Sequence, residues 1–428
     1  MKKYYSLYYG SISIGKSLSG LAGIITGLFV PTSYRRNALN KAVGRHFPTS
    51  SVFSFGSGRS ALTACLKAAG IGKGDDVLLS AYTCIAVPTG VIAAGARPVY
   101  MDIDPVTLNT DINQWQKALT GKVKAIVIQH TLGKPAPVEE ITAIARQKNI
   151  LVIEDCALAA GSSFNNKMLG SFGDASIFSM ELSKTMSCGW GGLLLVNDAS
   201  FARKVNEFYQ TVPASHFFAS AKDHFQTIVS AICHRAGVFF IGKYVLFLGF
   251  KIGLFRRSTP EAEYRGEVAD NFLVKMGHFQ LALAKRQWKD LPDIINLSRS
   301  NAALLYKELD RLNIQSPGSP AFGEIAIAPR VSFLVKDRAS ASKYFLDKGI
   351  ELGEWFDGPL SPEPQTDNFN YQKNDYPNAA WIAAHIANLP CNIRLTGKDM
   401  QYICLALADF AKDCPENFYH TNQSIPHA

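Results

Sequence analysis

Short apolar runs alternate with helical segments between residues 51 and 196. Each run has the continuous apolar character of a strand that is buried on both faces of a parallel sheet. The segments between the runs have helical spacing, so the pattern predicts a βαβ series and an α/β domain with helices on both faces of a mainly parallel sheet. The predicted strands are 77–80, 98–101, 125–129, 151–154, 174–178 and 193–196, and the predicted helices are 60–69, 85–94 and 138–147.

The second half of the chain predicts a smaller α+β domain. A helical pattern covers residues 277–309, and Pro292 predicts a break or kink within it. A strand at 330–335, a helix at 339–348 and an amphipathic helix at 397–411 follow. We therefore expect three parts: a basic N-terminal arm over 1–50, a large domain over 51–290 with an apolar insert at about 227–256, and a small C-terminal domain over 291–428.

Composition excludes several classes of protein. The 428 residues are 47% hydrophobic and 18% charged, which allows a large core and excludes global disorder. The eight cysteines are scattered and form no CxxC pair or Cys/His cluster, which argues against a zinc site or a disulfide framework. Isolated cysteines fit a reducing cytoplasm, where we expect the protein to reside.

The formal net charge of +9 is concentrated near the N-terminus. No acidic residue precedes Asp75, whereas ten lysines and arginines do. Such an arm suits nucleic acid, an anionic membrane surface or a phosphate-bearing ligand. No signature of a nucleic-acid-binding module accompanies it, so we expect no nucleic-acid partner.

Two apolar stretches raise the question of a membrane. Residues 21–30 are mostly apolar and follow basic residues, but no small-residue cleavage site of a signal peptide follows them. Residues 238–250 are apolar except for Lys243, and basic residues flank them. A spanning helix needs about 20 apolar residues, so a helix in the plane of the inner membrane face fits this stretch better. The alternative is a helix buried in the core or in a dimer.

Three motifs indicate chemistry. In Phe55-Gly-Ser-Gly-Arg-Ser-Ala-Leu62, small residues lead into a helix, whose free N–H groups and dipole can hold a phosphate. An ordinary helix N-cap gives the same pattern. Asp155 ends an apolar strand, where α/β sheets place ligand groups, and a carboxylate there can keep a pyridine nitrogen protonated. Lys184 lies between a strand and a glycine-rich turn, where a buried amine can form a Schiff base with an aldehyde cofactor.

Taken together, these motifs describe a site for pyridoxal 5'-phosphate (PLP): a phosphate cradle, a partner for the ring nitrogen and a lysine for the aldehyde. In these motifs and their order, the chain resembles the DegT/DnrJ/StrS family of fold-type I aminotransferases over roughly residues 53–411. Residues 70–77, 95–105, 170–174 and 388–390 resemble further sequence motifs of the family, in the same order. The resemblance implies a large PLP-binding domain and a smaller C-terminal domain.

The resemblance also assigns residue roles. Lys184 matches the lysine that binds the cofactor, Asp155 matches the partner of the ring nitrogen, and Ser179 matches a phosphate-binding serine. Gly58 also falls at the phosphate. Arg59 and Ser60 follow it, at positions where the family usually has a threonine and a small residue.

Four positions depart from the family pattern. Cys84 replaces an aromatic ring that stacks on the cofactor, Leu158 replaces a glutamine near the ring hydroxyl, and Trp190 replaces a glutamate. Leu273 replaces an asparagine that a partner subunit supplies, although Asn271 and Lys275 are close by.

The function that follows from the resemblance is transfer of an amino group from an amino acid, expected to be glutamate, to a keto sugar. The acceptor is either nucleotide-linked, as is usual in the family, or lipid-linked, as the basic arm and the apolar insert suggest. The resemblance further implies a homodimer with the active site at its interface. The alternative is a degenerate family member that binds a membrane or a protein partner without catalysis.

Overall fold

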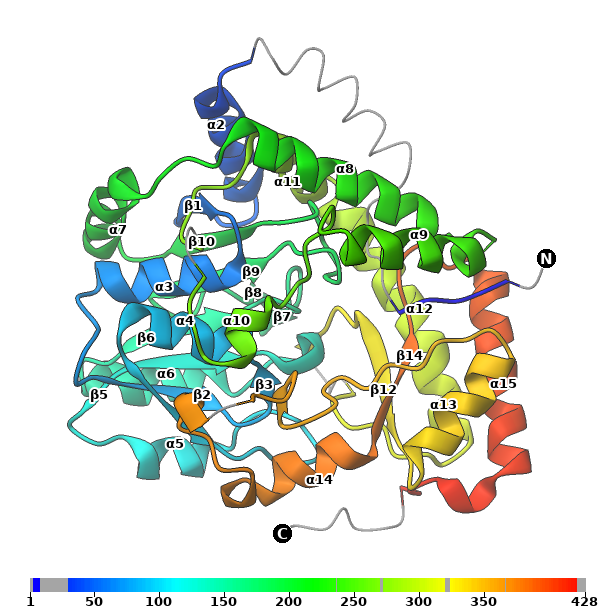
Figure 1. The fold of residues 1–428 in the computed structure, drawn as a ribbon. Helices are drawn as coiled ribbons and strands as arrows, with labels where there is room; N and C mark the ends of the chain where they lie inside the picture. Colours follow the sequence, from blue (N-terminus) through cyan, green and yellow to red (C-terminus); the bar gives the residue numbers. More distant parts are fainter. Residues whose placement is uncertain are drawn as a thin grey trace.

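Seven strands form a central sheet in the order β1-β10-β9-β6-β5-β2-β4 in the computed structural model of this chain (Figure 1). The neighbours from β9 to β4 pair in parallel, whereas β10 is antiparallel to both β1 and β9. The structure describes residues 3–7, 30–235, 237–269, 272–319, 324–365 and 367–421. The strands are β1 Ser51–Phe55, β2 Asp76–Ser80, β4 Arg97–Met101, β5 Val123–Gln129, β6 Leu151–Asp155, β9 Ala175–Ser179 and β10 Gly192–Val196.

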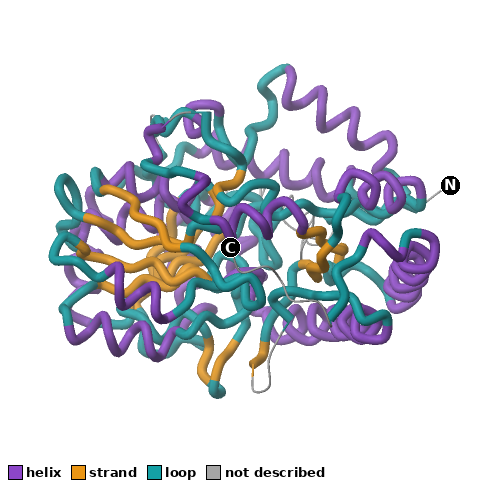
Figure 2. The backbone as a smooth tube through the Cα atoms, turned by 90° about the horizontal axis from the view of Figure 1, so that it is seen from below, coloured by secondary structure: helices purple, strands orange, loops and turns teal. Residues whose placement is uncertain are grey.

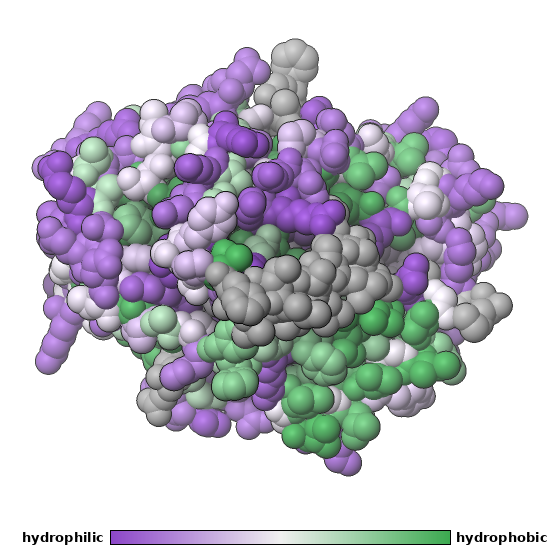
Figure 3. Space-filling view, turned by 90° about the horizontal axis from the view of Figure 1, so that it is seen from above, coloured by the Kyte–Doolittle hydropathy of each residue, from purple (hydrophilic) through white to green (hydrophobic). Residues whose placement is uncertain are grey.

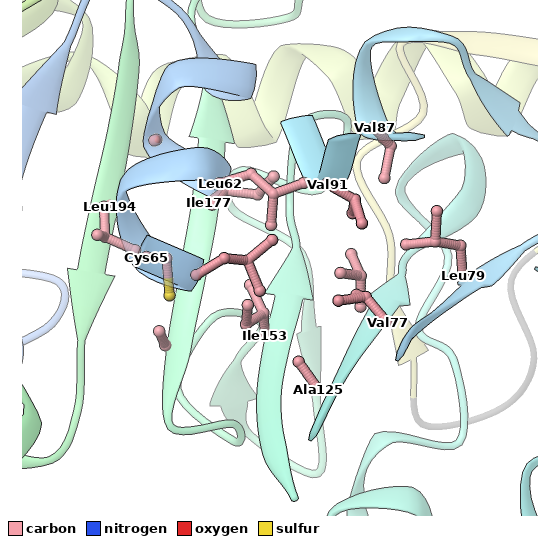
Figure 4. Packing of buried hydrophobic residues seen from close by; sticks show 14 of the residues in the cluster. Leu62, Cys65, Val77, Leu79, Val87, Val91, Ala125, Ile153, Ile177 and Leu194 are labelled. Carbon is pink, nitrogen blue, oxygen red and sulfur yellow. The ribbon is translucent and has the colours of Figure 1, made fainter. Parts of the chain in front are cut away.

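Helices cover both faces of this sheet, because successive strand residues point to opposite faces and both sets are apolar. Val77 and Leu79 pack into the core that α3, α4 and α7 cover, and Figure 4 shows their side chains with those of α3 and α4. Leu78 packs into the core under α2, α5, α6 and α11. The predicted α/β fold is thereby confirmed. These helices are α2 Thr32–Gly44, α3 Gly58–Ala68, α4 Ala86–Ala94, α5 Ile112–Ala118, α6 Val138–Gln147, α7 Ala199–Thr211 and α11 His278–Lys289.

A third hydrophobic core belongs to the smaller domain, whose two strands lie apart from the large sheet in Figure 2. The strands β12 and β14 pair antiparallel, and α12, α13 and α15 pack on them. Pro292 lies in the first turn of α12, and the chain breaks between α11 and α12 at Asp290, as predicted. The elements are α12 Leu291–Arg311, β12 Arg330–Leu334, α13 Arg338–Asp347, β14 Ile386–Pro390 and α15 Gly397–Asp413.

Two elements link the domains. Helix α12 begins in the large-domain core with Leu291 and ends in the small-domain core with Leu309. Helix α14, Pro377–His385, lies late in the chain but packs Ile382 into the large-domain core. The short elements are β3 Thr83–Cys84, which pairs with β13 Leu360–Ser361, and β7 Ser163–Phe164, which lies between β8 Lys167–Met168 and β11 Glu324–Ile325. Single helical turns are α10 Glu261–Tyr264, η1 Thr131–Gly133, η2 Asp367–Phe369, η3 Lys373–Asp375 and η4 Pro415–Asn417.

A buried carboxylate on β6 holds the loop between β8 and β9 against the sheet. The Glu154 carboxylate accepts hydrogen bonds from the N–H groups of Gly170, Phe172 and Gly173, at 2.7–2.8 Å. His130 Nδ1 accepts from the Ala136 N–H, so its Nε2 carries the hydrogen that is donated to Glu154 at 3.1 Å. Together with Cys156 these two side chains form a cluster that could ligate a metal ion. Because the carboxylate oxygens are already occupied by four donors, we assign the cluster a structural role.

The apolar insert folds as a helical hairpin along the top of the molecule in Figure 1. Helix α8, Phe217–Cys233, is followed by α9, Phe239–Lys251. Among the helices in the described part of the chain, none is long and apolar enough to cross a membrane. The other apolar stretch, 21–30, lies outside the described residues except for Val30, and so does most of the arm before α2.

Candidate active site

A cavity lies where the parallel strands end, the edge at which α/β sheets place their ligands. Strand β6 ends here with Asp155 and β9 ends with Ser179, while the antiparallel β10 begins here with Gly192. The cavity holds about 920 Å³ of empty space, part of it open to solvent. Its lining includes Gly58, Arg59, Cys84, Asp155, Ser179 and Lys184, which are six of the seven site residues predicted from the sequence.

The N-terminus of α3 forms one end of the cavity. The Ser57 side chain caps the helix by accepting a hydrogen bond from the Ser60 N–H at 3.1 Å. Within the described chain, no acceptor contacts the N–H groups of Gly58 and Arg59, as is expected for the first turn of a helix. A Cβ atom on Gly58 would lie 3.2 Å from the Ser179 Cβ, so glycine lets the loop approach β9 closely. Free N–H groups, the helix dipole and two serines suit a phosphate.

The Asp155 carboxyl group is buried beside this cradle. Among the described residues it accepts one hydrogen bond, from the Ala157 N–H at 2.9 Å. Burial raises the pKa of Asp155, while the Ala157 N–H and the charge of Lys184 oppose that rise. A buried carboxylate with so few partners is stabilised by a cation that enters the cavity, and a protonated pyridine nitrogen is such a cation.

Lys184 enters the cavity from the turn after β9. Its ammonium nitrogen lies 4.7 Å from the centroid of the Trp355 ring. Burial lowers the pKa of Lys184, an effect that Arg330 reinforces and that Cys84, Glu181 and Asp155 oppose. A lowered pKa makes the neutral, nucleophilic amine available nearer to neutral pH.

Two of the predicted phosphate residues have partners of their own. The Arg59 guanidinium forms an ion pair with Glu263 and donates to the Ser258 carbonyl at 2.6 Å. Its positive charge is therefore largely offset by Glu263. The Ser60 side chain does not line the cavity, because its hydroxyl donates to the Phe272 carbonyl at 2.8 Å.

The departures from the family pattern also have defined places. Cys84, Leu158 and Trp190 line the cavity. The Arg256 guanidinium carbon lies 3.9 Å from the centroid of the Trp190 ring, so an aromatic–cation pair occupies the expected place of a glutamate. Leu273 packs against the large-domain core. Lys275 lies 4.8 Å from the centroid of the Tyr209 ring, and Asn271 lies outside the described residues.

Sequence reasoning missed several residues that the fold brings to the cavity. Ser57 was overlooked because a capping serine gives no signal of ligand binding. Glu181 and Ser258 also line the cavity, and Trp355 arrives from the C-terminal half of the chain. Arg330, at the start of β12, lies with its guanidinium carbon 3.7 Å from the centroid of the Trp355 ring. A lone arginine or tryptophan far along the chain carries no local motif, so tertiary structure alone assigns them to the site.

The residues present fit PLP. The cradle offers free N–H groups and serine hydroxyls to a phosphate. Among the described residues the buried Asp155 carboxylate forms no ion pair, and Lys184 presents an amine with a lowered pKa to the same cavity. Cys84 offers a smaller contact surface for the ring than an aromatic side chain, but it leaves the three essential groups in place.

Comparison with known proteins agrees with this fold and site. The DegT/DnrJ/EryC1/StrS aminotransferase family matches residues 26–232 and 251–408, which leaves out 233–250. A pleiotropic regulatory protein of Geobacillus stearothermophilus is 42% identical over 150 residues, which span 35% of this chain and 40% of that protein. GDP-perosamine synthase of Escherichia coli O157:H7 is 26% identical over 83% of this chain and 85% of its own length.

A solved structure shows the same fold. It is a DegT/DnrJ/EryC1/StrS aminotransferase from Brucella abortus, 22% identical, with a TM-score of 0.71 over 92% of this chain and 95% of its own. The family match covers most of the chain, and the cradle, the carboxylate and the lysine lie together at the expected edge of the sheet. The protein therefore belongs to the DegT/DnrJ/EryC1/StrS aminotransferase family.

Proposed function

We propose that the protein is a PLP-dependent aminotransferase that moves an amino group from an amino acid to a keto sugar. The observation that carries the proposal is the convergence of Lys184, Asp155 and the α3 N-terminus on one cavity. Each group alone has an ordinary structural explanation. Their convergence at the carboxyl ends of the strands does not.

When bound, PLP supplies an aldehyde for amines and a pyridine ring that withdraws electrons. The N–H groups of Gly58 and Arg59, with Ser57 and Ser179, would hold its phosphate. The Asp155 carboxylate would accept a hydrogen bond from the ring nitrogen and keep it protonated. Lys184 Nζ, once its amine is free, takes a proton from the substrate and returns it, for which its lowered pKa is suited.

Two kinds of keto-sugar acceptor remain open. A relative that matches most of the chain is named GDP-perosamine synthase, which supports a nucleotide-linked sugar. The position of α9 supports a lipid-linked sugar, because Lys251 ends this apolar helix only seven positions before Ser258 of the cavity. We propose glutamate as the donor, on the family resemblance alone.

We also propose that the protein acts as a homodimer, as the family resemblance implies. Light scattering on the purified, PLP-loaded protein measures this directly. A mass of two chains supports the proposal, and a stable, active monomer contradicts it.

Turnover assays test the function. The protein is incubated with PLP, glutamate labelled with ¹⁵N, and a panel of keto sugars that are free, nucleotide-linked or lipid-linked. Mass spectrometry should find the label in one amino sugar. Lys184→Ala should abolish this transfer without unfolding the protein, whereas Lys204→Ala, at an exposed position of α7, should not. No transfer to any sugar, combined with no conversion of glutamate to 2-oxoglutarate, would support a non-catalytic role instead.

A further inference from the structure

Helix α9 turns two glycines and Leu246 towards the protein and most of its other large apolar residues outwards. Gly242, Leu246 and Gly249 are buried. A Cβ atom on Gly242 would lie 2.5 Å from the Cys233 carbonyl oxygen, so glycine lets α9 lie directly on the end of α8. On the outward side Phe240 is 74% and Phe247 is 65% exposed. Ile241, Tyr244, Val245, Leu248 and Ile252 are also exposed.

These side chains belong to a larger apolar surface. Helix α8 adds Phe218 and Phe225, which are both exposed. Figure 3 shows hydrophobic side chains gathered over α8 and α9 on the face seen from above. A contiguous apolar area of this kind on a soluble protein marks an interaction surface. We call the exposed residues named here for α8 and α9 the α9 surface.

Charge around the α9 surface favours an anionic partner. Residues 217–257 contain six lysines and arginines but a single acidic residue, Asp223. Asp223 is itself paired with Arg256 at 3.1 Å. His224 and His234 are held neutral, because burial lowers the pKa of each to about 4. Among the cations, Lys243 lies within the apolar face, with its nitrogen 4.8 Å from the centroid of the Phe240 ring.

The dimensions of α9 favour a position in the plane of a bilayer. Thirteen residues make a helix of about 20 Å, whereas the hydrocarbon core is about 30 Å thick. Large apolar and aromatic side chains on one face, with lysines at its middle and end, are typical of helices that lie at the headgroup boundary. The short length and the distribution of cations therefore both fit an interfacial helix.

Most of helix α9 lies outside the part of the chain that the family model matches. The match to the family skips residues 233–250, which include all of α9 except Lys251. The chain runs directly from α9 into the active site. After α9, Arg256 stacks on Trp190, and both Trp190 and Ser258 line the cavity.

We propose that the α9 surface binds an anionic lipid bilayer, with α9 lying in the plane of the headgroups and the cavity opening close to them. This inference does not depend on the transamination proposed above. Phe240 and Phe247 are exposed, but Leu246 is buried against Cys233 and Phe255, and Phe239 stacks on Tyr4 with ring centroids 4.1 Å apart.

Vesicle flotation tests the proposal with the full-length protein. Vesicles of phosphatidylcholine alone are compared with vesicles that also contain phosphatidylglycerol. The test variant combines Phe240→Ser, Phe247→Ser and Leu248→Ser, all on the outward face. The matched control combines Leu297→Ser, Leu346→Ser and Leu405→Ser, which are exposed leucines outside the α9 surface. Circular dichroism and light scattering on each variant report its fold and its oligomeric state.

We expect the wild type and the control to float with the anionic vesicles, more weakly with neutral vesicles or at high salt. The test variant should bind at least about a thousandfold more weakly, since each of its three large apolar side chains contributes roughly tenfold or more. A second variant, Lys243→Gln with Lys251→Gln, should lose the preference for anionic vesicles. Absence of wild-type binding would overturn the proposal, and so would equal binding by the test variant. A test variant of smaller oligomeric mass, with no vesicle binding by the wild type, would show that the α9 surface contacts a second copy instead.

Discussion

Replacing Gly192 by alanine tests the assignment of the phosphate cradle. The new Cβ would lie 2.3 Å from the carbonyl carbon and oxygen of Ser57 and 2.4 Å from the Gly58 nitrogen. Carbon atoms in contact are about 3.5–4.0 Å apart, so the Ser57–Gly58 peptide has to move by more than about 1 Å. Gly192 itself is held by pairing with Phe55 and Ser179, so the helix terminus moves rather than the strand.

This displacement should affect PLP binding more than folding. Overpacking typically costs about 1–3 kcal/mol, which a domain of this size tolerates. A misplacement of about 1 Å in a functional site, by contrast, can lower its function roughly a hundredfold. We therefore expect the dissociation constant for PLP, measured by absorbance titration, to rise by about that factor, with the circular dichroism spectrum unchanged.

Gly121→Ala is the matched control, because a Cβ there has no atom within 4 Å. It should bind PLP as the wild type does. A folded Gly192→Ala protein with wild-type affinity for PLP would refute the cradle. The phosphate would then lie elsewhere in the cavity.

Three further predictions follow from the site. Asp155→Asn should still bind PLP but lose about a hundredfold or more in turnover, measured with the labelled donor, because an amide cannot keep the ring nitrogen charged; near-normal turnover would make Asp155 a plain strand end. The rate at which apo-protein captures PLP should reach its plateau at a pH below the ordinary lysine pKa of 10.5, because burial lowers the pKa of Lys184. Asp155→Asn should shift this pH profile to lower pH, since the carboxylate raises the pKa of Lys184. A profile centred on the ordinary lysine pKa contradicts the burial argument. Glu154→Gln should lower the free energy of unfolding by about 2 kcal/mol or more in denaturant titrations, because buried N–H groups lose their acceptor. A chelator should leave the stability of the wild type unchanged. Destabilisation by the chelator would instead indicate a metal at Glu154.

Local pattern was sufficient for much of the large domain. The runs at 77–80, 125–129 and 151–154 were recognisable as strands because both faces are buried, and the structure confirms them. Strand β1 was missed, since Ser51–Phe55 mixes serines with apolar residues at the edge of the sheet. Helices α5 and α7 were also missed, because they lie in mainly polar sequence.

The site and the insert show where sequence alone is insufficient. Asp155 and Lys184 could be found because a strand end and a glycine-rich turn have local signatures. The partners of Arg59 could not be found from the sequence, since Glu263 lies about 200 positions away. In α9 every face is apolar, so its sequence cannot say which side chains are buried. The backbone contact of Gly242 with Cys233 decides that.

The most direct test of the central claim is to locate the lysine that binds PLP. The protein is loaded with PLP, reduced with borohydride, digested and mapped by mass spectrometry. We predict a pyridoxyl group on the peptide that contains Lys184, and its absence from that peptide in Lys184→Ala. Attachment to a different lysine, or no attachment after loading with excess PLP, would contradict the account.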